Sequence, residues 1–114
     1  MKTEVAFWDT SALVPVCCHQ GNSLAARRLA RQYRKQVVWW GTRIEARGAF
    51  FRLSREKDLS ATELRHALAN FAALRASQSV ILPSDEVGDL AEAVLDDYAL
   101  RAADALQLAA ALYW

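Results

Sequence analysis

Short apolar runs alternate along the chain with longer segments in which apolar residues recur at helical spacing. The runs are continuous in apolar residues and bounded by charged or turn-forming residues, which is typical of strands buried on both faces. The longer segments repeat leucine and alanine every three or four residues among charged residues, which indicates helices with one exposed face. Strands are expected over residues 5–8, 36–40 and 79–83, and helices over 24–34, 43–56, 60–77, 84–98 and 101–114.

The order of these elements predicts an α/β protein. Strands that alternate with amphipathic helices favour a parallel sheet with helices on both faces, which makes a three-layer α/β/α fold on a short sheet. Hydroxyl residues support three of the helix starts: Ser84 alone, and Thr42 and Ser60 each with a glutamate three residues later, as in a capping box. A chain of 114 residues without repeats predicts one domain over residues 1–114.

Composition limits the classes of protein that need be considered. Apolar residues make up 54% of the chain, enough for a core, and the net charge is only +1, so any nucleic-acid contact must come from local basic patches. Cys17 and Cys18 are adjacent, and neighbours do not form an ordinary loop-closing disulfide, so reduced thiols are expected. We find no long apolar segment and no signal-peptide pattern, and we therefore expect a cytoplasmic protein with no membrane contact.

Two carboxylates are predicted to lie at one edge of the sheet. Asp9 ends the first strand, and ligands of open α/β sheets gather outside the carboxyl ends of the strands. Glu45 lies in the first turns of the helix after the second strand, near the same edge. Each also has a structural interpretation: Asp9 as a cap with Thr10 and Ser11, and Glu45 as the partner of Thr42 in a capping box.

The last helix supplies a third acid. Residues 101–114 are apolar nearly all round, which predicts a buried helix, and Arg101, Asp104 and Gln107 form a polar stripe at i, i+3 and i+6. A buried Asp104 needs a cationic partner, which Arg101 or a metal could provide. Three converging acids raise one another's pKa or recruit a divalent cation, and oxygen ligands alone suit Mg²⁺ or Mn²⁺, which can promote attack on a phosphodiester.

The sequences FWDTSALV, RIEARGAF and LRAADALQLAAA, in this order, resemble the PIN-domain family, and among its members the VapC-type toxins. The resemblance covers essentially the whole chain and implies a PIN-like fold. It implies a Mg²⁺- or Mn²⁺-dependent endoribonuclease, the toxin of a type II toxin–antitoxin pair, with an RNA substrate, a cognate antitoxin and a homodimer. By position it implies that Asp9, Glu45 and Asp104 are the catalytic, metal-binding acids. Thr10 or Ser11 then matches the supporting hydroxyl, and Gln107 is a further candidate for a supporting role.

The sequence also departs from this pattern. The family usually continues after the last helix into a further strand with a fourth acid, which has no counterpart here, so the last strand or strands of the fold are expected to be missing. This favours an alternative in which the domain cleaves RNA weakly or not at all and acts as a protein-binding module. A phosphoryl-transfer protein that uses Asp9 as its nucleophile is a further alternative, although Ser11 stands where such an enzyme needs a second acid.

Basic and apolar residues suggest where partners bind. Arg43, Arg47 and Arg52 flank Glu45 and are predicted to guide an RNA backbone to the acids. The helical hairpin of residues 43–77 is predicted to offer an apolar groove to the antitoxin.

Overall fold

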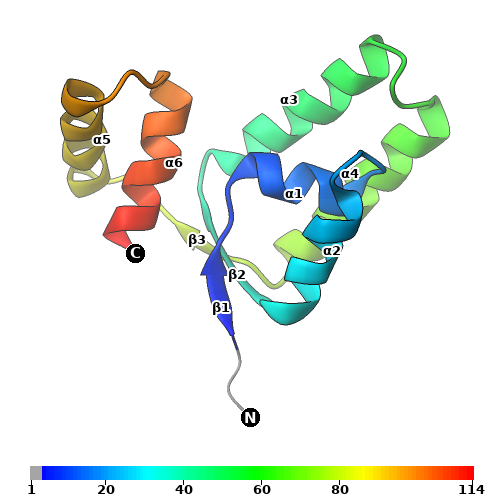
Figure 1. The fold of residues 1–114 in the computed structure, drawn as a ribbon, viewed down its shortest axis with the longest axis horizontal. Coiled ribbons are helices and arrows are strands. Elements are labelled where there is room, and N and C mark those ends of the chain that lie inside the picture. Colours follow the sequence, from blue (N-terminus) through cyan, green and yellow to red (C-terminus); the bar gives the residue numbers. More distant parts are fainter. Residues whose placement is uncertain (1–3) are drawn as a thin grey trace.

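The computed structural model of the protein describes residues 4–114 (Figure 1). The strands are β1 (Val5–Phe7), β2 (Lys35–Trp39) and β3 (Ser79–Ile81). The helices are α1 (Thr10–Cys17), α2 (Ser23–Gln32), α3 (Thr42–Arg55), α4 (Ala61–Arg75), α5 (Asp85–Asp97) and α6 (Ala102–Tyr113).

The three strands form a parallel sheet in the order β1-β2-β3. The register pairs Phe7 with Val37, and Val38 with Val80, so β2 is the central strand. Helices α1–α4 lie on one side of this sheet and α5 and α6 lie on the other (Figure 1). The predicted α/β class and the three-layer α/β/α arrangement are therefore confirmed.

Helix α1 is an element that the apolar pattern did not predict. It begins directly after β1, with Asp9 as its N-cap, and it contains Pro15 in its interior. A proline removes a backbone donor there, so propensity argues against a helix. Burial of Leu13, Val14 and Cys17 against the neighbouring helices compensates for this loss, and packing decides the local structure.

The helix starts follow the predictions at two of three positions. Ser60 and Glu63 form a complete capping box, and Ser84 accepts a hydrogen bond from the Val87 amide. Thr42 is not a cap: Gly41 is the N-cap residue of α3, and the buried Thr42 hydroxyl turns toward α6. A Cβ at Gly41 would lie 2.5 Å from Nε1 of the Trp39 side chain, so only glycine fits between β2 and α3 here.

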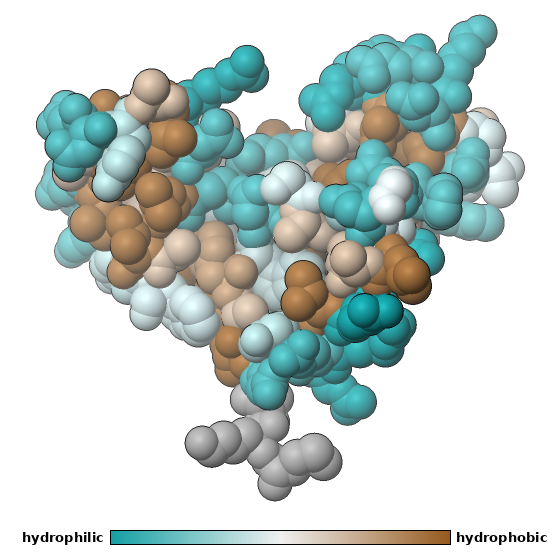
Figure 2. Space-filling view, viewed as in Figure 1, coloured by the Kyte–Doolittle hydropathy of each residue, from teal (hydrophilic) through white to brown (hydrophobic). Residues whose placement is uncertain are grey.

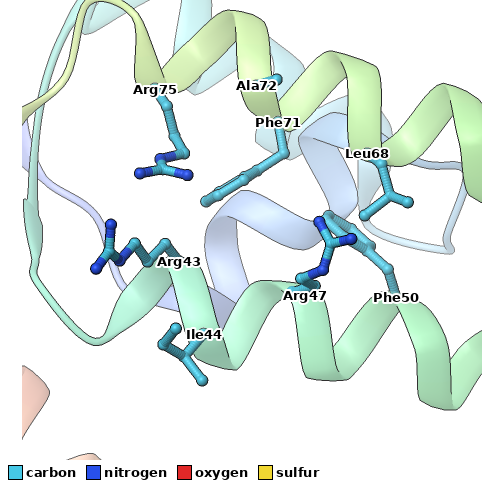
Figure 3. Close-up of a pocket in the computed structure, with 8 residues that line it drawn as sticks. All are labelled: Arg43, Ile44, Arg47, Phe50, Leu68, Phe71, Ala72 and Arg75. Atoms are coloured by element: carbon cyan, nitrogen blue, oxygen red, sulfur yellow. The ribbon is translucent and has the colours of Figure 1, made fainter.

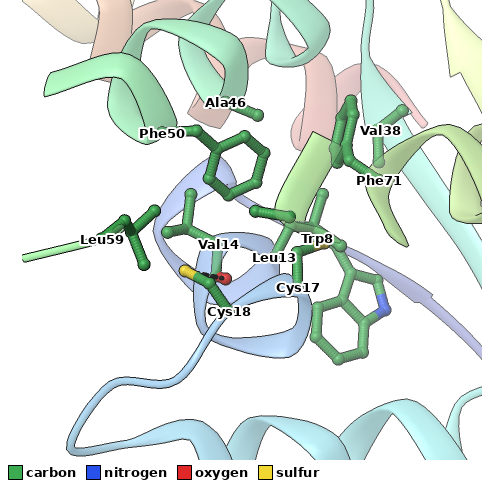
Figure 4. Packing of buried hydrophobic residues seen from close by; sticks show 11 residues of the cluster. Trp8, Leu13, Val14, Cys17, Cys18, Val38, Ala46, Phe50, Leu59 and Phe71 are labelled. Atoms are coloured by element: carbon green, nitrogen blue, oxygen red, sulfur yellow. Dashed lines mark hydrogen bonds between the residues drawn. The ribbon is translucent and has the colours of Figure 1, made fainter. Parts of the chain in front are cut away.

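The core has two parts, one on each face of the sheet. The larger part lies among α1, α3 and α4 and contains Trp8, Leu13, Phe50 and Phe71, whose packing is shown in Figure 4. The rings of Phe50 and Phe71 meet edge to face with centroids 6.1 Å apart. The smaller part consists mainly of alanines of α5 and α6 with Trp39 and Val87: Ala91, Ala105, Ala109 and Ala110.

Helix α6 is less buried than its composition predicts. Its alanine face and Gln107 are buried, but Asp104 is exposed, and so are Leu108 and Leu112. The expectation that Asp104 is a buried charge in need of a cation is wrong, because α6 packs on only one side. Figure 2 shows apolar side chains gathered over the α5–α6 part of the molecule.

Within residues 4–114, no helix has both the length and the apolar character needed to cross a membrane.

Candidate functional site

Gln107 joins three helices at the carboxyl edge of the sheet. Its side chain is 5% exposed, and its Nε2 group lies 2.9 Å from Oγ1 of Thr10, 3.0 Å from Oγ1 of Thr42 and 3.0 Å from Oε1 of Glu45. Thr10 opens α1 directly after β1, and Thr42 opens α3 directly after β2. The ends of both strands are therefore tied to α6 by one amide group.

The nitrogen of the Gln107 amide has several hydrogen-bond partners, whereas its oxygen has none among the described residues. An amide nitrogen has two hydrogens, which are shared here among three acceptors, while the Thr10 and Thr42 hydroxyls remain able to donate. Oε1 of Gln107 is buried and has no hydrogen-bond partner among the described residues. A buried acceptor left unpaired costs about 1–3 kcal/mol, which offsets part of what the three contacts of the amide nitrogen contribute.

The environment of Glu45 couples it to the other two predicted acids. Burial raises the pKa of Glu45 above its ordinary value, and the hydrogen bond from Gln107 opposes this shift. The negative charges of Asp9 and Asp104 also raise the pKa of Glu45, and a hydrogen bond with Thr10 lowers it. The charges of Asp9 and Asp104 thus both act on the Glu45 carboxyl group.

Asp9 has a structural role as well as a place at this edge. Its carboxylate accepts a hydrogen bond from the Ser11 amide at 3.3 Å and a short one from the Ser11 hydroxyl, as expected for the N-cap of α1. The alternative interpretation of Asp9 as a cap is therefore confirmed. Asp9 also lines a cavity of about 270 Å³ together with Asp104 and Gln107, next to the side chains of Phe7, Leu108 and Ala111.

A divalent cation at these acids would have to keep part of its hydration shell. Among residues 4–114, no three histidine, cysteine or acidic side chains are close enough to hold a metal ion between them. Mg²⁺ keeps several of its waters and needs only one or two carboxylates from a protein. Asp9 and Asp104 line one cavity, and the side chain of Gln107 belongs to the same lining. The donor set is all oxygen, so it suits Mg²⁺ or Mn²⁺.

The predicted RNA-binding arginines divide between two faces of α3. At 3.6 residues per turn, Arg43 and Arg47 lie about 200° around the helix from Glu45, whereas Arg52 lies on the same face as Glu45, about two turns away. The Arg43 guanidinium stacks over Trp40 at 4.7 Å, and that of Arg47 lies 5.4 Å from the Phe51 ring centroid. Arg43 and Arg47 therefore lie on the face of α3 turned from Glu45, and Arg52 alone remains a candidate beside it.

Arg75 is a notable basic residue that sequence reasoning missed. It ends α4 and lines a cavity between α3 and α4 together with Arg43 and Arg47. The sequence did contain a signal for this proximity. Arg43 and Arg75 are equally far along the chain from Leu59, which lies at the turn of the predicted helical hairpin. Antiparallel helices place such residues side by side.

Comparisons of the chain with known protein families and with curated proteins find no match to either.

Proposed function

We propose that this protein is a Mg²⁺- or Mn²⁺-dependent endoribonuclease of the PIN-domain type, the toxin of a type II toxin–antitoxin pair. The observation that supports this proposal is the cavity that Asp9 and Asp104 line together with Gln107, whose amide group also bonds Glu45 at the carboxyl edge of the sheet. Converging acids would repel an RNA phosphate, so a nuclease built on them needs a bound cation.

Asp9 and Asp104 would hold the cation, because they line the same cavity. When bound, Mg²⁺ or Mn²⁺ stabilises negative charge on a phosphodiester and makes water more acidic. Glu45 would receive a proton from an attacking water, since its raised pKa makes it a better base than an ordinary carboxylate. Gln107 fixes the direction of the Glu45 carboxylate, and Arg52, on the same face of α3, would contact the RNA backbone.

The partners that we propose follow from the resemblance of the sequence to VapC-type toxins. They are an RNA substrate, a cognate antitoxin and a second copy of the chain in a homodimer. A cytoplasmic location is supported by Cys17 and Cys18, which are both buried and free. Burial raises the pKa of Cys17 to about 12, so this thiol is unreactive in the folded protein.

A second candidate is a domain that binds a protein partner without cleaving RNA. The observation in its favour is that no three acidic, histidine or cysteine side chains within residues 4–114 are close enough to hold a metal ion together. A cation held by only two carboxylates and water would bind more weakly than one held by a closed site.

RNA cleavage distinguishes the two candidates. Purified protein is incubated with single-stranded RNA and Mn²⁺, and the fragments are mapped. We expect endonucleolytic cuts that vanish with a chelator and that fall by about a hundredfold or more in Asp9→Asn and Asp104→Asn. Asp96→Asn, on the exposed face of α5, changes the net charge equally and is the matched control. Cleavage that persists in both site variants, or no cleavage by any protein, would reject the nuclease in favour of the binding module.

A further inference from the structure

Three arginines surround an apolar cavity between α3 and α4, away from the acids. The cavity has a volume of about 260 Å³ and is lined by Arg43, Arg47 and Arg75 above buried Phe50 and Phe71, with Ile44, Leu68 and Ala72 completing it. Figure 3 shows the Arg43 and Arg75 side chains reaching into the gap from opposite helices, with the Phe71 ring beside Arg75. None of the described residues that line this cavity is acidic.

The charge in this cavity is not balanced from within it. Nε of Arg43 is buried and has no hydrogen-bond partner among residues 4–114. Guanidinium groups that share a partly apolar cavity repel one another, and the repulsion grows as the surroundings become less polar. A carboxylate can accept two hydrogen bonds from one guanidinium in a planar fork and would relieve this repulsion. The chemistry therefore calls for an anion.

The surroundings of Arg43 and Arg75 call for apolar groups as well. The same two arginines line a second cavity of about 250 Å³ over the sheet, with Trp40, Val80 and Leu82. Val80 and Leu82 are 44% and 64% exposed. Each cavity is smaller than the clefts that hold drug-sized ligands, and each suits a single side chain. Arg43 and Arg75 thus lie between two cavities, each of which could hold one apolar side chain.

We infer that this surface binds an acidic segment of a partner protein. A carboxylate of that segment lies between Arg43 and Arg75, and apolar side chains on either side of it fill the two cavities. Single-stranded RNA fits less well, because its phosphates would leave the Phe50–Phe71 floor and the Val80–Leu82 surface without apolar contacts. The inference does not depend on nuclease activity, since Arg43 and Arg47 lie on the face of α3 opposite Glu45.

Fluorescence anisotropy with short labelled peptides tests the inference. The probe peptide carries glutamate flanked by leucine and phenylalanine. One comparison peptide replaces glutamate by lysine, and another replaces the apolar residues by serine. We expect the protein to bind the probe about tenfold or more tightly than either comparison peptide, since both the anion and the apolar groups contribute. Equal binding of all three peptides, or no binding of the probe, would overturn the inference.

Variants of the protein locate the binding surface. Arg43→Glu with Arg75→Glu should weaken probe binding by about tenfold or more. Arg28→Glu with Arg31→Glu on α2 makes the same change in charge at exposed positions and should leave binding within about twofold. Ala72→Trp fills the cavity without removing charge, so it should also weaken binding of the probe. This variant tests the site even if the double charge reversal impairs folding.

Labelled oligouridine distinguishes a peptide site from an RNA site. The peptide site predicts that oligouridine does not displace the probe and that Ala72→Trp leaves the weak binding of oligouridine unchanged. Suppose instead that oligouridine displaces the probe, and that the double variant Arg43→Glu, Arg75→Glu binds neither the probe nor oligouridine. The surface would then be an RNA-binding surface. Equal weakening of the probe in the α2 control variant would show that only overall charge matters. Either result would overturn the inference.

Discussion

The two helical layers of this molecule are packed by different kinds of side chain. The α1–α4 layer buries large apolar groups such as Trp8, Leu13 and Phe50. The α5–α6 layer buries mainly alanine, with Val87 and Trp39 as its larger members. Burial of apolar area contributes roughly 25 cal/mol per Å², so the first layer contributes much more stability than the second.

This difference matters because the candidate site spans both layers. Asp9 and Glu45 are fixed by α1 and α3, whose positions depend on the large apolar core. Asp104 and Gln107 lie on α6, which reaches the sheet through small side chains. The three groups that accept from the Gln107 amide, on Thr10, Thr42 and Glu45, therefore connect a strongly packed layer to a weakly packed one. Loosening α6 should separate the acids before the rest of the fold is lost.

The largest expected effect comes from breaking the stronger layer. Phe50 is fully buried, and Phe50→Ala should lower the free energy of unfolding by about 3–5 kcal/mol, measured by urea denaturation. Phe51, its neighbour on the exposed side of α3, is the matched control, and Phe51→Ala should cost about 1 kcal/mol or less. Similar losses in the two variants would mean that the large core does not dominate stability.

A smaller effect on stability, but a specific one on the site, is expected from removing the connection between the layers. Gln107→Ala leaves the Thr10 and Thr42 hydroxyls and Glu45 without their shared donor, which should cost about 1–3 kcal/mol of stability. Calorimetry should also show Mn²⁺ affinity reduced by about 10–100-fold, because α6, which carries Asp104, loses its hydrogen bonds to α1 and α3. Gln78→Ala breaks one hydrogen bond to Gln36, far along the chain from the site, and is the control. Equal Mn²⁺ affinities in the two variants would remove Gln107 from the site.

The smallest expected effect is a pH dependence of stability due to Glu45. Its folded pKa is raised, chiefly by burial, so the folded state holds this proton to higher pH than the unfolded chain does. The contribution of Glu45 to stability is therefore complete below the unfolded pKa, about 4.3, and is lost as pH rises through the folded pKa. Urea denaturation from pH 4 upward should show Glu45→Gln gaining stability relative to the unaltered protein. If the unaltered protein instead gained stability relative to Glu45→Gln as the pH rises, the pKa of Glu45 would not be raised in the folded state.

The fold was predictable wherever the local pattern and the tertiary packing agree. The strands around Val37 and Val80 and the capping box of Ser60 with Glu63 were all predicted, because period, composition and cap chemistry point the same way. Helix α1 was not, since Pro15 and the preceding hydroxyls favour a turn and only burial of Leu13 overrides them.

The site was predictable by topology and not in detail. Sequence order alone places Asp9 and Glu45 at one edge of a parallel sheet, and the coupling of Glu45 to both aspartates agrees with that placement. The connecting role of Gln107 and the exposure of Asp104 depend on how α6 rotates on the sheet, which its nearly uniform apolar sequence does not determine. Arg75 was missed because its neighbours are set by hairpin geometry and not by any local motif.

The proposed nuclease activity requires a divalent cation bound between Asp9 and Asp104. The most direct test is calorimetric titration with Mn²⁺ of the unaltered protein and of Asp9→Asn, Asp104→Asn and the control Asp96→Asn, each checked for folding by circular dichroism. We expect saturable binding in the unaltered protein and in Asp96→Asn, and a loss of affinity of about a hundredfold or more in the two site variants. Equal Mn²⁺ affinity in all four proteins, or no binding by any of them, would contradict the proposal.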